Sequence, residues 1–116
     1  MLFMILVKAA KNSEEGKLPS ERLMQAMDAY NEELEQAGVR VMAKGLHPTA
    51  NAIRISYPAD RGEPVVTNGP FAPAEDLVAG FILIDVATQE DAVRWAKRMP
   101  DPQGNGEGQI ELRQVF

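Results

Sequence analysis

The chain has 116 residues, of which 45% are hydrophobic and 25% charged. This predicts a single domain over residues 1–116 with one hydrophobic core, and it excludes disordered, collagen-like and coiled-coil chains. The formal net charge of -5 argues against nucleic acid and anionic membranes as partners, because both require clustered Lys and Arg. The lack of Cys excludes disulfides, thiolate metal sites and Cys nucleophiles.

An apolar segment opens the chain over residues 2–7. It is much shorter than the roughly 20 apolar residues that cross a bilayer. No basic region precedes it, as one would in a signal peptide, so we expect a cytoplasmic protein. Its residues are apolar on both faces, which predicts a strand that is buried on both sides. Residues 8–17 are polar and predict a loop.

A helix is predicted over residues 20–37. Ser20 is a suitable N-cap, and Gly38 lies where a C-terminal glycine is expected. Spacings of three and four residues give this helix one apolar stripe, formed by Leu23, Met27, Tyr30 and Leu34.

The middle of the chain alternates in the manner of strands. A strand over residues 39–44 ends before His47 and Pro48, and two short strands over residues 51–57 and 63–67 flank a turn-forming stretch. Residues 68–73 contain two prolines and one glycine, which predicts a loop.

The last third predicts a strand, a helix and a strand. Residues 78–86 are apolar on both faces except at Asp85. Thr88 is expected to cap the helix, with Asp91 in a position for reciprocal capping. Pro100 ends this helix, whose buried stripe is expected to be Ala92, Trp95, Ala96 and Met99. Residues 101–108 predict a flexible Gly-rich loop too polar to pack, before a final strand over residues 110–115.

This order predicts an α+β fold: a ferredoxin-like βαββαβ core with an inserted β-hairpin. Two helices cover only one face of such a sheet, yet two strands are apolar on both faces. A second copy of the chain is the simplest cover, so we expect a homodimer joined through the open sheet face.

Several stretches are similar to a known family. Residues 68–76 read Asn-Gly-Pro-Phe-Ala-Pro-Ala-Glu-Asp, residues 79–86 read Ala-Gly-Phe-Ile-Leu-Ile-Asp-Val, and residues 110–116 read Ile-Glu-Leu-Arg-Gln-Val-Phe. Together with residues 91–100 and Gly45-Leu46-His47-Pro48, they resemble the YCII-related proteins. Within this family they resemble the DGPF branch, which is named for an Asp-Gly-Pro-Phe-Ala-Glu-Thr-Lys-Glu motif.

The resemblance implies a dimeric α/β-barrel type of fold in a cytoplasmic bacterial protein of undefined activity. Some members resemble accessory proteins encoded near extracytoplasmic-function sigma factors, and others have been proposed as enzymes that use a His–Asp pair. Here the motif's first Asp is Asn68, its first Glu is Pro73 and its Lys is Glu75; only the final acid is kept, as Asp76. These changes remove carboxylates that acid–base catalysis would use.

His47 is the only histidine. It either closes a strand as a polar residue, or acts as a general base oriented by Asp76 or Asp85. A single His without Cys does not build a metal site, so no metal is expected. Asp85 shares a face with Phe81 and Leu83, so it should pair with Arg113, Arg54 or Lys44, or lie in a wet cleft.

The loop of Asn68, Gly69, Pro70 and Phe71 is either a turn chosen for backbone geometry or the lining of a ligand site. In the second interpretation Phe71 is the apolar wall, with Arg54, His47, Asp76 and Asp85 as polar groups.

Two functions follow. The first is a non-catalytic homodimer that binds a ligand, such as a small organic acid, in a regulatory or accessory role. The second is a small cofactor-free isomerase, lyase or dehalogenase acting on a small organic acid through His47 and a carboxylate.

Overall fold

The computed structural model describes all residues from Met1 to Phe116. It contains six strands, three α-helices and two short 3-10 helices. In chain order these are β1 (Leu2–Lys8), α1 (Lys11–Glu14), α2 (Glu21–Gln36), β2 (Arg40–Gly45), η1 (Thr49–Asn51), β3 (Ile53–Ser56), β4 (Val65–Asn68), η2 (Ala74–Asp76), β5 (Val78–Asp85), α3 (Gln89–Arg98) and β6 (Ile110–Gln114). No helix combines the length and the apolar character that crossing a bilayer requires.

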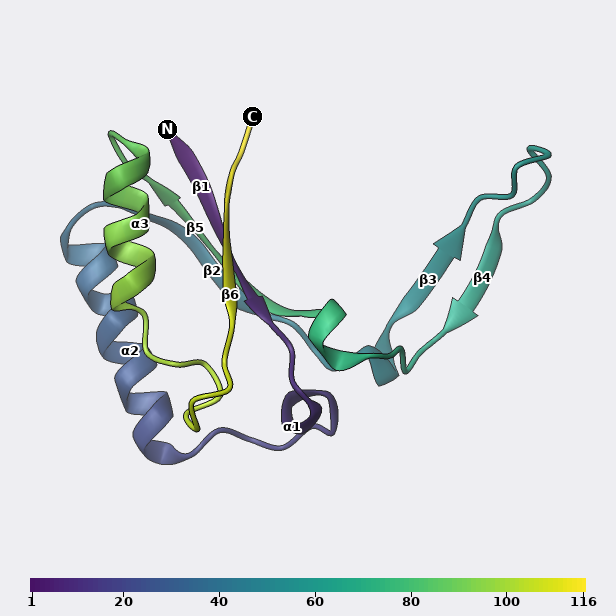
Figure 1. Cartoon of the computed structure of the whole chain (residues 1–116), viewed down its shortest axis with the longest axis horizontal. Helices are drawn as coiled ribbons and strands as arrows, with labels where there is room; N and C mark the ends of the chain where they lie inside the picture. The colour runs from purple at the N-terminus through teal and green to yellow at the C-terminus, as the bar shows by residue number, and fades with distance from the viewer.

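Four strands form one antiparallel sheet in the order β2-β5-β1-β6. The helices α2 and α3 lie together on one side of this sheet (Figure 1). The fold is therefore α+β, and this arrangement is consistent with a ferredoxin-like fold.

The core lies between these two helices and the sheet. Alternate residues of β1 and β5 point into it, because successive side chains of a strand point to opposite faces. Ile5, Ile84 and Leu34 are fully buried there. The remaining buried members of this cluster are Phe3, Tyr30, Ile82, Val86, Ala92, Ala96 and Met99.

The helix termini follow the sequence signals closely. The Ser20 hydroxyl accepts a hydrogen bond from the Leu23 N–H at 3.1 Å, and Gly38 follows α2 with a φ of 73°. The Thr88 hydroxyl accepts from the Asp91 N–H at 3.1 Å. The expected reciprocal contact from Asp91 is absent, because its carboxylate pairs with Arg94 one turn further along the helix.

Two segments predicted to be plain loops are more ordered than expected. Residues 11–14 form α1, whose first turn is closed by Ser13: its hydroxyl accepts from the Ala10 N–H at 2.8 Å. The Gly-rich segment after α3 is organised by the Asp101 carboxylate. This carboxylate accepts hydrogen bonds from the N–H groups of Gln103 at 2.9 Å and Gly106 at 2.6 Å.

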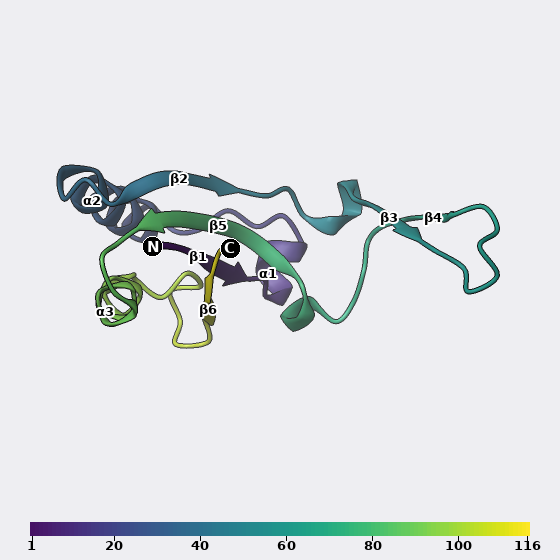
Figure 2. The same ribbon diagram turned by 90° about the horizontal axis from the view of Figure 1, so that it is seen from above.

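The strands β3 and β4 form a separate two-stranded sheet, which we call the arm (residues 53–68). Figures 1 and 2 both show the arm projecting from the domain on the side away from α2 and α3. The pairing of Ile55 with Val66 and of Ile53 with Asn68 places three apolar side chains on one arm face. Ile53, Ile55 and Val66 are each more than half exposed.

The sheet face opposite the helices carries Leu2, Met4, Leu6, Phe81 and Leu83. We call it the open face. These five residues are only half-buried, although their neighbours Phe3, Ile5, Ile82 and Ile84 are buried. The register continues the open face onto the neighbouring strands, because Met42 pairs with Leu83, Lys44 with Phe81, and Arg113 with Met4.

Candidate functional site

The loop that follows β4 packs against the chain at η1. The Gly69 N–H donates to the Ala52 carbonyl at 2.9 Å. A Cβ atom on Gly69 would lie only 1.6 Å from the Thr49 carbonyl oxygen. Glycine is therefore required here by close backbone approach, so this motif position has a structural reason.

Thr49 connects the loop to α1. Its hydroxyl accepts from the Phe71 N–H at 2.9 Å and donates to the Glu14 carboxylate. The same carboxylate accepts from the Thr49 N–H at 3.1 Å. No sequence signal marks Glu14 or Thr49, because the two residues are far apart in the chain and neither belongs to a motif.

Arg54 and Phe71 do come together, as expected for a shared site. The Arg54 guanidinium carbon lies 3.9 Å from the centroid of the Phe71 ring. Cation–π contacts at this distance contribute about 0.5–1 kcal/mol at exposed positions. Arg54 is exposed and Phe71 half-buried, so the pair presents a cation above an aromatic surface at the base of the arm.

The expected catalytic pair is not assembled within one chain. His47 follows β2 and is exposed, and it makes no hydrogen bond or ion pair. Asp76 ends η2 and is also exposed. Neither Asp76 nor Asp85 forms a hydrogen bond or an ion pair with His47.

Asp85 is paired differently from the expectation. Its carboxylate lies 3.1 Å from the amino group of Met1. Leu2 pairs with Asp85 across β1 and β5, which brings Met1 beside this carboxylate. Arg113 is instead 3.8 Å from Glu111, and Arg54 lies over Phe71. The predicted pairing of Asp85 with Arg113, Arg54 or Lys44 is therefore wrong within the chain.

The titration of two groups is shifted, and both lie outside the loop of residues 68–71. Burial raises the pKa of the Tyr30 phenol to about 12, although nearby Arg98 opposes the shift. The backbone N–H groups that bind Asp101, led by that of Gln103, lower the pKa of its carboxyl group. No three His, Cys, Asp or Glu side chains lie close enough together to hold a metal ion.

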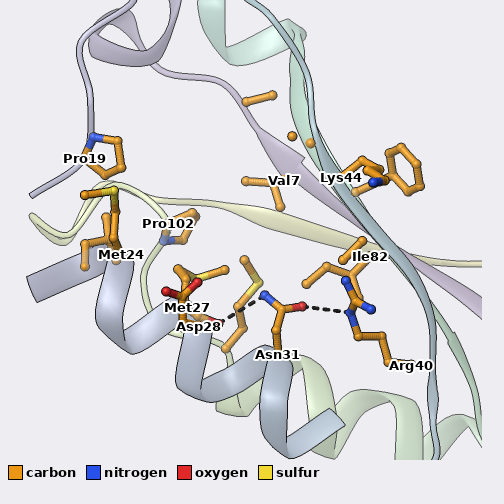
Figure 3. Close-up of a pocket in the computed structure, with 17 residues that line it drawn as sticks. Val7, Pro19, Met24, Met27, Asp28, Asn31, Arg40, Lys44, Ile82 and Pro102 are labelled. Atoms are coloured by element: carbon orange, nitrogen blue, oxygen red, sulfur yellow. Dashed lines mark hydrogen bonds between the residues drawn. The ribbon is translucent and has the colours of Figure 1, made fainter. Parts of the chain in front are cut away.

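A cavity of about 410 Å³ lies between the first half of α2 and the sheet (Figure 3). Its walls come from α2, β1, β2, β5 and the end of α3, and nine of its 17 lining residues are hydrophobic. No motif or hydrophobic pattern in the sequence predicted this cavity. Only the two glycines Gly45 and Gly80 could have indicated it. They pair directly across β2 and β5 at the floor of the cavity, where they leave the space without side chains.

These features define a small α+β domain. Both long helices lie on one face of an antiparallel sheet, and the loop beside the sheet requires a glycine at position 69. A model of the YCII-related domain matches residues 1–116, and the chain belongs to this family. An uncharacterized protein of Rhizobium meliloti (strain 1021) is 33% identical to it over 82 residues. This stretch spans 71% of the present chain but only 64% of that relative.

Proposed function

We propose that this protein is a cytoplasmic, DGPF-type member of the YCII-related family that works as a homodimer and binds a small organic acid. In this proposal its role is accessory or regulatory, alongside a sigma factor, as the resemblance implies. The observation that carries the proposal is the open face, an apolar sheet surface with no element of its own chain above it.

The chemistry of the open face favours a second copy as its cover. Its centre on β1 and β5 is apolar, whereas its rims carry Lys44 on β2 and Glu111 and Arg113 on β6. An apolar centre with a polar rim of both signs is the composition of a protein interface. A two-fold axis pairs such a surface with itself, and the two sheets then form the dimeric barrel.

The arm supports the same arrangement. It extends on the side of the open face and gains little burial from its own chain (Figures 1 and 2). A second copy over the open face would lie within reach of the apolar residues Ile53, Ile55 and Val66. We therefore propose that the arm packs against the partner.

The proposed ligand site is the base of the arm. Arg54 provides a positive charge for a carboxylate, and Phe71 provides an apolar wall beneath it. His47, Asp76 and the backbone of residues 68–70 complete the polar surroundings, whereas Asp85 lies at the opposite end of β5 beside the Met1 amino group. A few polar groups beside an apolar wall are the usual composition of a small-molecule site.

Light scattering tests the dimer. The wild type is expected at about twice the chain mass of 12.7 kDa. Phe81→Asp should give monomer or unfolded chain, because it places an unpaired charge in the interface. Val93→Asp is the matched control: it puts the same charge on an exposed position of α3, and it should remain dimeric. A monomeric wild type would refute the dimer.

Thermal-shift measurements with small carboxylic acids test the ligand site. An acid that stabilises the wild type should lose its effect in Phe71→Ala and in Arg54→Gln. Equal stabilisation of all three proteins places the site elsewhere. Turnover of the acid that disappears in His47→Ala, while binding persists, would replace the accessory role by an enzymatic one.

A further inference from the structure

The cavity beneath α2 exists because side chains are missing from the helix-facing side of the sheet. Gly45 and Gly80 lie opposite each other, with Val7 next to Gly80 on β1. A Cβ atom added to Gly45 would meet no atom within 4 Å, so the space above it is empty. At the other end of α2, Tyr30 and Leu34 fill the corresponding space and are buried.

The lining is apolar and deformable. Leu23, Met24 and Met27 of α2 form one wall, and Met99 contributes from the end of α3. Three of the six methionines in the chain therefore face one cavity. Methionine side chains are flexible and polarisable, and they adapt to apolar ligands of different shapes.

A half-buried cation lies at the edge of this apolar space. Arg40 donates from Nε to the Asn31 side-chain oxygen at 3.3 Å (Figure 3). Its Nη1 donates to the Glu35 carboxylate at 3.0 Å. A guanidinium has five N–H donors, so others remain for a ligand. Of the other charged lining residues, Asp28 is exposed, and Lys44 lies beside Phe81 with its side chain on the open face. Arg40 is therefore the cation whose side chain faces the cavity.

We infer that this cavity is a second binding site, distinct from the base of the arm, for an elongated apolar molecule that ends in a carboxylate. The apolar chain would lie between the α2 methionines and the glycine floor, and the carboxylate would bind Arg40. The volume of about 410 Å³ falls within the range of roughly 300–1,000 Å³ that is usual for small-molecule pockets.

Octanoate is a suitable probe, with octanol as its uncharged counterpart. In protein labelled with 13C at the methionine methyl groups, octanoate should shift the resonances of Met24, Met27 and Met99. It should leave those of Met4 and Met42 on the opposite face unchanged. No shift at all, or shifts confined to Met4 and Met42, would overturn the inference.

Filling the cavity gives a second test. Gly45→Val should weaken octanoate binding by at least about tenfold in calorimetry, whereas Gly45→Ala, which adds one methyl group, should retain most of it. Arg40→Gln should reduce the preference for octanoate over octanol, and Arg40→Lys should restore it in part. Octanoate binding that survives Gly45→Val but is lost in Phe71→Ala would assign the ligand to the base of the arm instead.

Discussion

Replacing Tyr30 by Phe tests how the two helices are held together. The Tyr30 side chain comes from α2 and is only 2% exposed, and its hydroxyl donates to the Trp95 carbonyl of α3 at 2.6 Å. Tyr30→Phe keeps the ring but removes this hydrogen bond. We expect a loss of about 1 kcal/mol in the free energy of unfolding at neutral pH.

The effect should depend on pH in a defined direction. The unfolded phenol loses its proton near pH 10.0, whereas the folded phenol keeps it until about pH 12. Between these values unfolding releases a proton, so the wild type loses stability as the pH rises. A tenfold difference in acid dissociation constant corresponds to about 1.4 kcal/mol, so a pKa that rises from 10.0 to about 12 makes this loss on the order of 3 kcal/mol.

The Tyr30→Phe variant has no phenol to ionise at this position. Its deficit in the free energy of unfolding, relative to the wild type, should therefore shrink above pH 10 and vanish before pH 12. Urea unfolding followed by fluorescence measures both proteins, and Trp95, the single tryptophan, reports from the contact itself. Taking the difference between the two proteins cancels other alkaline titrations. Tyr57→Phe, at an 81% exposed tyrosine, is the control and should match the wild type. A Tyr30→Phe deficit that stays constant from pH 8 to pH 12 would refute this reasoning.

Three further changes test other parts of the fold. Leu34 is fully buried, so Leu34→Ala should lower the free energy of unfolding by about 2–5 kcal/mol, as measured by urea titration. A smaller loss would show that the core collapses around the gap. Asp101→Asn should lower the melting temperature at neutral pH, because the amide nitrogen cannot accept the N–H bonds that the carboxylate accepts. This difference should disappear in acid, since the lowered pKa stabilises the fold only while Asp101 is ionised; a deficit that persists at pH 2 would contradict it. Gly69→Ala should lower the free energy of unfolding by on the order of 1–3 kcal/mol, because its methyl group would overlap the Thr49 carbonyl. Gly45→Ala should change stability little. Equal effects of the two substitutions would be inconsistent with the packing described.

The sequence was sufficient to predict the elements that carry a periodic pattern. The apolar stripe of α2, ending in Leu34 and Gly38, and the Thr88 cap of α3 were readable because the information is local. The apolar residues on both faces of β1 and β5 also indicated a sheet with one face left open. The structure confirms the α+β fold that these patterns predicted.

The contacts at the candidate site were not predictable in the same way. The bond between Thr49 and Glu14 joins residues 35 positions apart, and nothing near either residue marks the other. The pairing of Asp85 with Met1 follows from strand register, which composition does not reveal. The cavity under α2 depends on atoms that Gly45 and Gly80 lack, and hydrophobic patterns record only the side chains that are present.

In the proposed dimer, the arm would determine which related chains can pair with one another. Its apolar residues contribute little to the core of their own chain, so we expect substitutions at Ile53, Ile55 or Val66 to leave folding largely unaffected. In the proposed dimer the same substitutions alter the fit to the partner. If this dimer forms, the arm could diverge after gene duplication and exclude mixed dimers between paralogues, while the sheet and helices stay under a common constraint.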